Sequence, residues 1–217
     1  MKLAIRSYME RCLLIFVVSA AAITVVASCQ PNRDMSLLTD EPCAAPCWQG
    51  IVPGVSTAED ARRVLETCVY VSEGNYSEER QGRQTKLLLW HPADCPECLN
   101  SITFQDDVVF TINLKVTYSL KAEQILEKYG PPEGMTVGIG GLPEWQYIAV
   151  GMHYPSRGLT FVASVPLQEP RIEPTTVIAS ASYYSPTSFD DPTFMGPDFL
   201  HLVKPWQGYG ELEVPEE

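Results

Sequence analysis

A helix signature followed by three strand-like runs occurs twice in this chain, and that repetition constrains the fold more than any other feature. In the first copy, VSTAEDARRVLETC, Ser56 and Glu59 have the spacing of a helix N-terminal capping box. In the second copy, SLKAEQILEKYGPPEG, Ser119 is the expected cap, and Gly130 with the prolines after it ends the helix. The apolar stripes that each helix would bury are Ala58, Ala61, Val64, Leu65 and Cys68, and Ala122, Ile125, Leu126 and Tyr129.

Three runs with strand periodicity follow each helix signature. The expected runs are 85–91, 100–105 and 108–116 after the first helix, and 146–154, 158–165 and 176–184 after the second. Asp106 and Asp107 are the expected hairpin turn between two of them. The pattern predicts an α+β protein with two αβββ units, each a short helix and a three-stranded antiparallel meander.

Two further segments carry no repeat of this pattern. Residues Glu73–Arg83 are polar and predict a mobile insertion. The GIGG stretch at Gly138–Gly141 follows no clear strand and opens no evident helix, so no phosphate-binding loop is expected there. The C-terminal segment alternates prolines with aromatic residues, so its rings are expected to pack on the body without extending the sheet. The predicted organisation is a signal peptide (1–28), a flexible tether (29–48), two units (49–117 and 118–185) and an irregular tail (186–217).

The N-terminus has the form of an export signal. Three basic residues, Lys2, Arg6 and Arg11, lie in the first eleven, and the 15 residues Leu13–Ala27 contain nothing more polar than serine or threonine. A bilayer-spanning helix needs about 20 apolar residues, so a cleaved signal is favoured over an uncleaved anchor.

The signal ends in Val26-Ala27-Ser28-Cys29, which resembles the lipobox of bacterial lipoproteins. The resemblance implies that the Cys29 thiol receives a diacylglycerol and that the signal is cut before it. Two or three acyl chains hold a protein firmly to a membrane. We therefore expect a lipid-anchored protein on the extracytoplasmic face of the cell membrane.

The body of the chain resembles two further groups. The segments PGVSTAEDA and YGPPE are similar to the helix starts and stops of β-lactamase-inhibitor-like domains and of small lipoproteins of outer-membrane assembly. The opening PCWQGIVPGVS is similar to that of uncharacterised bacterial lipoproteins. These resemblances imply a protein-binding or scaffold role in the cell envelope, and they bring no site residues with them.

The charge of the chain excludes one class of partner. Removal of residues 1–28 takes away three basic residues and one acidic residue, which leaves 12 basic and 26 acidic residues and a net charge of −14. A nucleic-acid-binding protein neutralises phosphates with Lys and Arg. No nucleic-acid partner is expected, and the expected contacts are the membrane, through the anchor, and an envelope protein.

The cysteines of the exported chain have several interpretations. Outside the cytoplasm thiols oxidise, so CAAPC and CPEC are each expected to close a local disulfide or to pair with one another or with the remaining cysteine. Alternatives are a redox-active CPEC motif, and zinc held by His91 with the CPEC thiols or by four thiols. A Cys68 nucleophile with His91 or His153 as base is a further alternative. The residues concerned are Cys43, Cys47, Cys68, Cys95, Cys98 and His91.

No catalytic residue, bound metal or cofactor is predicted, because the common nucleophile, phosphate-loop and metalloprotease motifs are missing from the sequence. The four tryptophans are candidate binding aromatics, since such residues supply many anchor contacts at interfaces, and the alternative is that they fill the core. They are Trp48, Trp90, Trp145 and Trp206. The expected function is a non-catalytic binding or scaffold protein, and the alternative is a thiol-redox or zinc-dependent envelope enzyme that uses CPEC.

Overall fold

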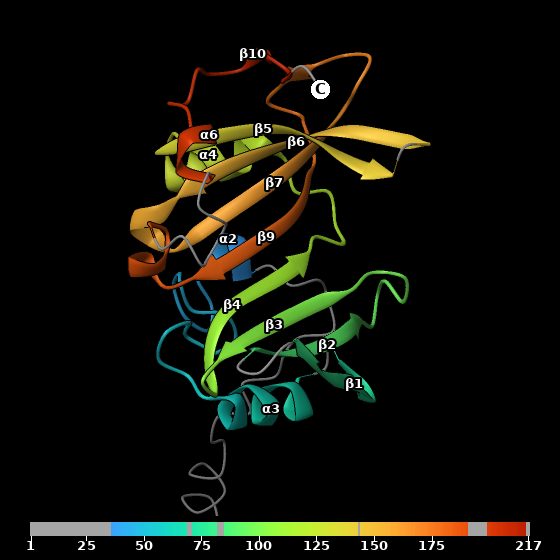
Figure 1. The fold of residues 1–217 in the computed structure, drawn as a ribbon, viewed down its shortest axis with the longest axis vertical. Helices are drawn as coiled ribbons and strands as arrows, with labels where there is room; N and C mark the ends of the chain where they lie inside the picture. The colour runs from blue at the N-terminus through green and yellow to red at the C-terminus, as the bar shows by residue number, and fades with distance from the viewer. Residues whose placement is uncertain (1–35, 69–70, 82–84, 143, 191–198, 216–217) are drawn as a thin grey trace, which may run out of the picture.

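One eight-stranded antiparallel sheet organises the molecule, with strand order β1-β2-β3-β4-β9-β7-β6-β5 (Figure 1). The computed structural model describes residues 36–68, 71–81, 85–142, 144–190 and 199–215, so the signal and Cys29 lie outside the described residues. The sheet strands are Val71–Gln81 (β1), Thr85–Pro92 (β2), Asn100–Gln105 (β3), Val108–Lys115 (β4), Gly134–Leu142 (β5), Trp145–Tyr154 (β6), Leu159–Pro166 (β7) and Ile178–Tyr184 (β9). The protein is therefore mixed α+β with a mostly antiparallel sheet.

The two halves of the sheet meet at β4 and β9. These strands pair antiparallel, with Ile112 opposite Tyr183 and Leu114 opposite Ala181. Strands β1 to β4 thus form one half of the sheet, and β5, β6, β7 and β9 form the other half. Two short strands, Arg171–Ile172 (β8) and Gly210–Glu211 (β10), form a separate ladder.

Both expected helices are present, with different caps from those predicted. They are Ala58–Thr67 (α3) and Ala122–Tyr129 (α4). The N-cap of α3 is Thr57, whose hydroxyl accepts from the Asp60 N–H. Ser56 instead accepts from the Val52 N–H, and the second N-cap is Lys121. The predicted stripes face the core, since Ala61 and Leu65 of α3 and Ile125 of α4 are fully buried.

Each half of the sheet has four strands where three were predicted. The polar segment expected to be a mobile insertion is the edge strand β1, which pairs with β2. Its side chains reach the adjacent helix: Glu78 pairs with Arg62, and the Tyr76 hydroxyl donates to Glu66. Tertiary contacts therefore hold a strand that its own polar sequence does not indicate.

The GIGG stretch, which the sequence analysis assigned to no element, forms part of the strand β5. Glycine weakens a strand unless another group approaches closely. Here a Cβ at Gly140 would lie 2.9 Å from the Tyr147 ring, so the ring of the paired strand covers the glycine. Because the ring belongs to β6, the residues next to Gly140 in the sequence do not reveal this contact.

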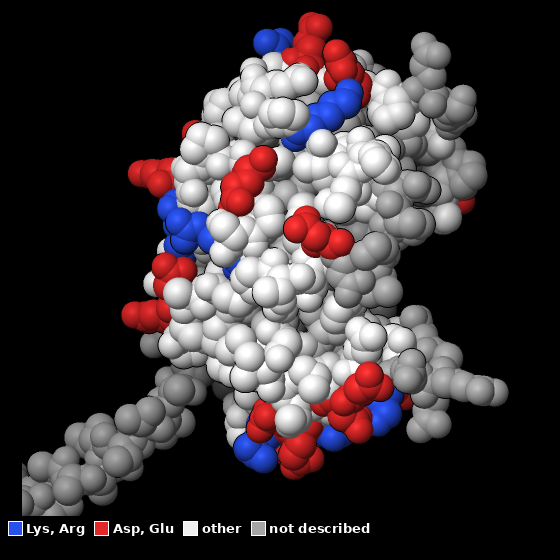
Figure 2. Space-filling model, turned by 60° about the vertical axis from the view of Figure 1, so that its left-hand side comes forward, with Lys and Arg blue, Asp and Glu red and all other residues white. Residues whose placement is uncertain are grey.

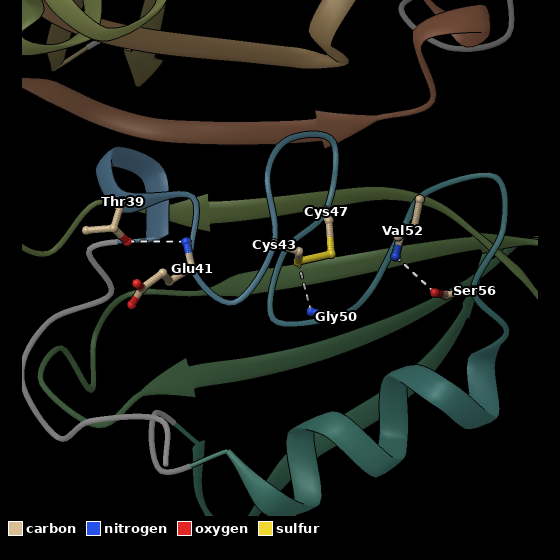
Figure 3. Close-up of a disulfide and its surroundings, with 7 residues drawn as sticks. All are labelled: Thr39, Glu41, Cys43, Cys47, Gly50, Val52 and Ser56. Atoms are coloured by element: carbon tan, nitrogen blue, oxygen red, sulfur yellow. Dashed lines mark hydrogen bonds between the residues drawn. A yellow bond between two sulfur atoms is a disulfide. The ribbon is translucent and has the colours of Figure 1, made fainter. Parts of the chain in front are cut away.

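The predicted tether is wrong from Ser36 onward. The short helix Ser36–Thr39 (α2) buries Leu37, whose carbonyl accepts from the Tyr129 hydroxyl at 2.6 Å. Beyond it, a disulfide joins Cys43 and Cys47, and the Gly50 N–H donates to Cys43 Sγ (Figure 3). The segment contacts both halves of the sheet, and buried residues of both halves form one continuous core.

The C-terminal segment lies beside β5. It contains the short helix Phe199–Leu202 (α6) and then Lys204, which forms an isolated bridge with Met135 at the start of β5. Among the described residues, no helix is long and apolar enough to cross a bilayer.

A candidate binding site at the β5 edge

The cysteines that the sequence offered for chemistry form local bridges. Disulfides join Cys43 to Cys47 and Cys95 to Cys98, as the first interpretation predicted. Cys68 belongs to neither bridge and is 4% exposed at the end of α3. A substrate has no access to a thiol buried in this way, which argues against Cys68 as a nucleophile.

The CPEC loop between β2 and β3 is a disulfide-closed turn that differs from a thioredoxin-type motif and from a zinc site. The Cys98 N–H donates to the Cys95 carbonyl in a turn, and no described helix begins at Cys95 to lower the pKa of its thiol. His91 Nδ1 lies 2.7 Å from the Cys98 carbonyl oxygen and positions the loop. Zinc binds thiolates, whereas both cysteine pairs are disulfides, and the described residues contain no cluster of metal-ligating side chains.

The four tryptophans have different environments. Trp48 and Trp90 are 2% and 1% exposed and stack with centroids 5.6 Å apart, so they belong to the core and offer no surface to a partner. Trp206 is half-buried and meets Tyr209 edge-on. Trp145 is 61% exposed at the start of β6. Of the four, Trp145 is the one placed to contact another molecule.

His153 is a structural residue of the β5 side of the sheet. It is 1% exposed, and its two ring nitrogens lie 2.9 Å and 3.0 Å from the hydroxyls of Thr160 and Thr136. Burial lowers the pKa of His153 to about 4, so the ring is neutral at pH 7. Phe189 and Phe199 pack against it. The histidine thus ties β5, β6 and β7 together beneath the edge.

Strand β5 ends the sheet with an exposed backbone. Met135 exchanges both of its backbone hydrogen bonds with Lys204, so its N–H and C=O point away from β6. Backbone direction alternates along an antiparallel strand, and the β5–β6 register is regular from Gly134 to Leu142. The N–H and C=O groups of Val137, Ile139 and Gly141 therefore point outward, and we call these three residues the β5 edge.

Within the described residues, no strand pairs with the β5 edge. The nine residues of β5, GMTVGIGGL, carry no charge and no proline. Ile139 is 37% exposed, and Leu142 and Trp145 at the turn into β6 are 52% and 61% exposed. A strand with a free backbone and apolar side chains is a template for another strand.

A pocket of about 110 Å³ adjoins the β5 edge. Met135 and Val137 line it from β5, and Leu202 and Leu212 line it from the C-terminal segment. Lys204 and Glu213 also line it and form an ion pair at 3.0 Å. An engineered apolar cavity of about 150 Å³ holds benzene. This pocket therefore has room for one branched aliphatic side chain.

Comparison of the sequence with protein-family models, with curated proteins and with solved structures gives no match. The resemblances to bacterial lipoproteins and to small envelope domains stay predictions, and the geometry of the site carries the functional argument.

Sequence reasoning named Trp145 as a candidate and missed the other residues of this site. Val137, Ile139 and Leu142 lie in a stretch that the sequence analysis assigned to no strand. The edge position itself depends on strand order, which no local pattern encodes.

Proposed function

We propose that this protein is a lipid-anchored, extracytoplasmic binding protein of the cell envelope, without catalytic activity, that holds a partner protein at the β5 edge. The observation that carries the proposal is the β5 edge, which is uncharged and pairs with no strand among the described residues, with Leu142 and Trp145 exposed beside it. Monomeric proteins guard such edges with charge, proline or a covering element, and an unguarded one indicates an interaction surface.

The location rests on the lipobox and is supported by the disulfides. Bridges such as Cys43–Cys47 and Cys95–Cys98 form in oxidising compartments. Ser36, the first described residue, is seven positions after Cys29, and seven extended residues span at most about 25 Å. The anchored body would stay close to the membrane surface, where an envelope partner is accessible.

The surface charge also fits a protein partner. Figure 2 shows acidic side chains distributed over one face, basic ones beside several of them, and a wide area with neither. Ion pairs such as Lys128–Asp40 and Lys86–Asp107 occupy basic groups. The visible face carries no continuous basic surface for a phosphate backbone.

We also propose that the fold is built from two related αβ units, each with one strand more than the predicted αβββ unit. Matched backbone contacts support this: the N-cap residue of each helix forms an isolated bridge, Thr57 with Val108 and Lys121 with Val177. In each unit the first helical residue donates to the residue before the bridge partner, and the residue after that partner donates back to the residue before the N-cap. The bonds are Ala58 N–H to Asp107 O, Val109 N–H to Ser56 O, Ala122 N–H to Thr176 O and Ile178 N–H to Leu120 O, at 2.8–2.9 Å.

Two experiments test the function. Fractionation of cells expressing Cys29→Ala should move the protein from the membrane to the soluble extracytoplasmic fraction, and retention in the membrane would contradict the lipid anchor. A photo-crosslinking amino acid at position 145 should capture envelope polypeptides, and capture should fall in a Leu142→Asp background. Position 79 on β1, which is also exposed, is the matched control and should capture nothing above background. Equal capture from both positions would refute a site at β5.

A further inference from the structure

We infer that the partner binds as an extended peptide strand that pairs with the β5 edge and places one aliphatic side chain in the adjoining pocket. This inference rests on the proposed function and specifies the chemistry of its partner. Backbone hydrogen bonds supply the affinity in such strand addition, and pockets for alternate side chains supply the specificity.

The length of the added strand follows from the two ends of the edge. Met135 already bonds to Lys204 on that side, and Pro143, which follows β5, has no N–H to offer. Three residues remain, Val137, Ile139 and Gly141, with up to six outward groups. A partner segment of about five residues is long enough to form one backbone hydrogen bond with each of these N–H and C=O groups.

The side chains of the added strand meet a continuation of the core. Val137 and Ile139 lie opposite Val150 and Ile148, which are fully buried. Side chains of opposite residues share one face of an antiparallel sheet, so the face that carries Val137 and Ile139 is the core face. Apolar residues of the partner on this face would cover Ile139, which is 37% exposed, and reach the pocket beside Val137.

Charge and side-chain complementarity favour a foreign strand over a second copy. Each copy carries a net charge of −12 before signal removal, so two copies repel one another. Antiparallel self-pairing of the free window would also place Gly141 opposite Val137, and glycine has no side chain to fill the pocket. The occupant is therefore an extended segment with aliphatic residues at alternate positions and basic flanks.

The test uses the mature soluble protein and a library of synthetic peptides. Each peptide alternates Thr with Val, Leu, Ile or Phe, carries Lys at both ends and is acetylated and amidated. The best binder is then compared with the same peptide N-methylated at alternate residues, which keeps every side chain and removes the N–H groups of one edge. We expect saturable binding, slower amide exchange at Val137 and Ile139, and more than tenfold weaker binding after N-methylation, because about two or three hydrogen bonds are lost together.

Protein variants give an independent measurement. Ile139→Pro removes one outward N–H and leaves the bonds to β6 in place, since proline is tolerated on edge strands; Ile139→Ala keeps the N–H and is the matched control. The proline variant should bind about tenfold more weakly than the alanine variant. If Ile139→Pro does not fold, Ile139→Lys, which places a charge on the edge, gives the same comparison.

Several outcomes overturn the inference. They are no binding by any peptide, equal binding of the N-methylated peptide, protection of Val137 and Ile139 only in a protein dimer, and protection by phospholipid vesicles but not by peptide. Crosslinking from position 145 that persists while the peptides fail would refute strand addition and leave the proposed function standing. Loss of both would refute both.

Discussion

The two edge strands of the sheet, β1 and β5, present opposite chemistry to solvent. Glu78 and Glu79 of β1 are exposed, and the pairing of β1 with β2 is irregular between Val71 and Tyr76. Charge and irregularity both obstruct the addition of another strand. Strand β5 has no charge and a regular register. The comparison teaches that one edge is protected and the other is left available, which is the pattern expected of a protein with one strand-binding side.

The first prediction compares the stability contributions of a buried residue of β6 and of the exposed residue opposite it on β5. Ile148→Ala, in β6 opposite Ile139, should lower the free energy of unfolding by about 2–5 kcal/mol, because Ile148 is fully buried and truncation leaves a cavity. Ile139→Ala is the matched control and should cost less than about 1 kcal/mol, since its side chain is partly in water. Urea unfolding of both variants measures this. Equal losses would show that the edge residue is part of the core.

The second prediction concerns acid and the β5 half. The pKa of His153 is lowered by burial from 6.5 to about 4, so as the pH falls below 6.5 the unfolded chain binds a proton that the folded protein does not. Stability should therefore fall between pH 6.5 and pH 4, by about 2 kcal/mol at pH 5. Urea unfolding at pH 7 and pH 5 measures the loss.

His153→Gln is the control for this pH dependence, because glutamine can bond to the Thr136 and Thr160 hydroxyls and does not titrate. The part of the pH dependence that belongs to His153 should disappear in this variant. An unchanged slope would assign the acid sensitivity to other groups.

The third prediction removes the protection of β1. Glu78→Val combined with Glu79→Val makes this edge less charged, and we expect concentration-dependent self-association in sedimentation velocity. Glu97→Val with Glu127→Val removes two exposed charges away from β1 instead and should leave the protein as it was. A monomeric double variant on β1 would show that its charges do not guard the edge and would break the comparison.

The smallest expected effect is on the ion pair that links β1 to α3. The Arg62 guanidinium lowers the pKa of the Glu78 carboxyl through a hydrogen bond, but the two side chains are 30% and 42% exposed. Glu78→Gln should therefore cost less than about 1 kcal/mol at pH 7, and the loss should shrink in high salt. A loss above this range would mean that the pair, and not only backbone pairing, holds β1 in place.

Sequence patterns located the elements that have periodic burial. The stripes of α3 and α4 were found because buried positions recur at helical spacing. The Asp106-Asp107 turn was found because two aspartates separate two strand-like runs, and in the structure both residues take positive φ in a two-residue hairpin. The sequence predicted disulfides but left their pairing open, and the structure shows that both bridges are local. Edge strands β1 and β5 were missed, since one is polar and the other glycine-rich, and neither alternates like a half-buried strand.

The sequence by itself determined the helices, the central strands and the acidic charge, and it predicts an export signal and lipidation of Cys29. The helices and strands depend on residue types within a few positions of one another, and the charge depends on composition alone. Tertiary structure alone decided which strands lie at the edges, that Trp48 and Trp90 stack in the core while Trp145 faces water, and that Lys204 of the C-terminal segment pairs with Met135 at the start of β5. Strand order and burial arise from contacts between distant parts of the chain, and the candidate site is a product of those contacts.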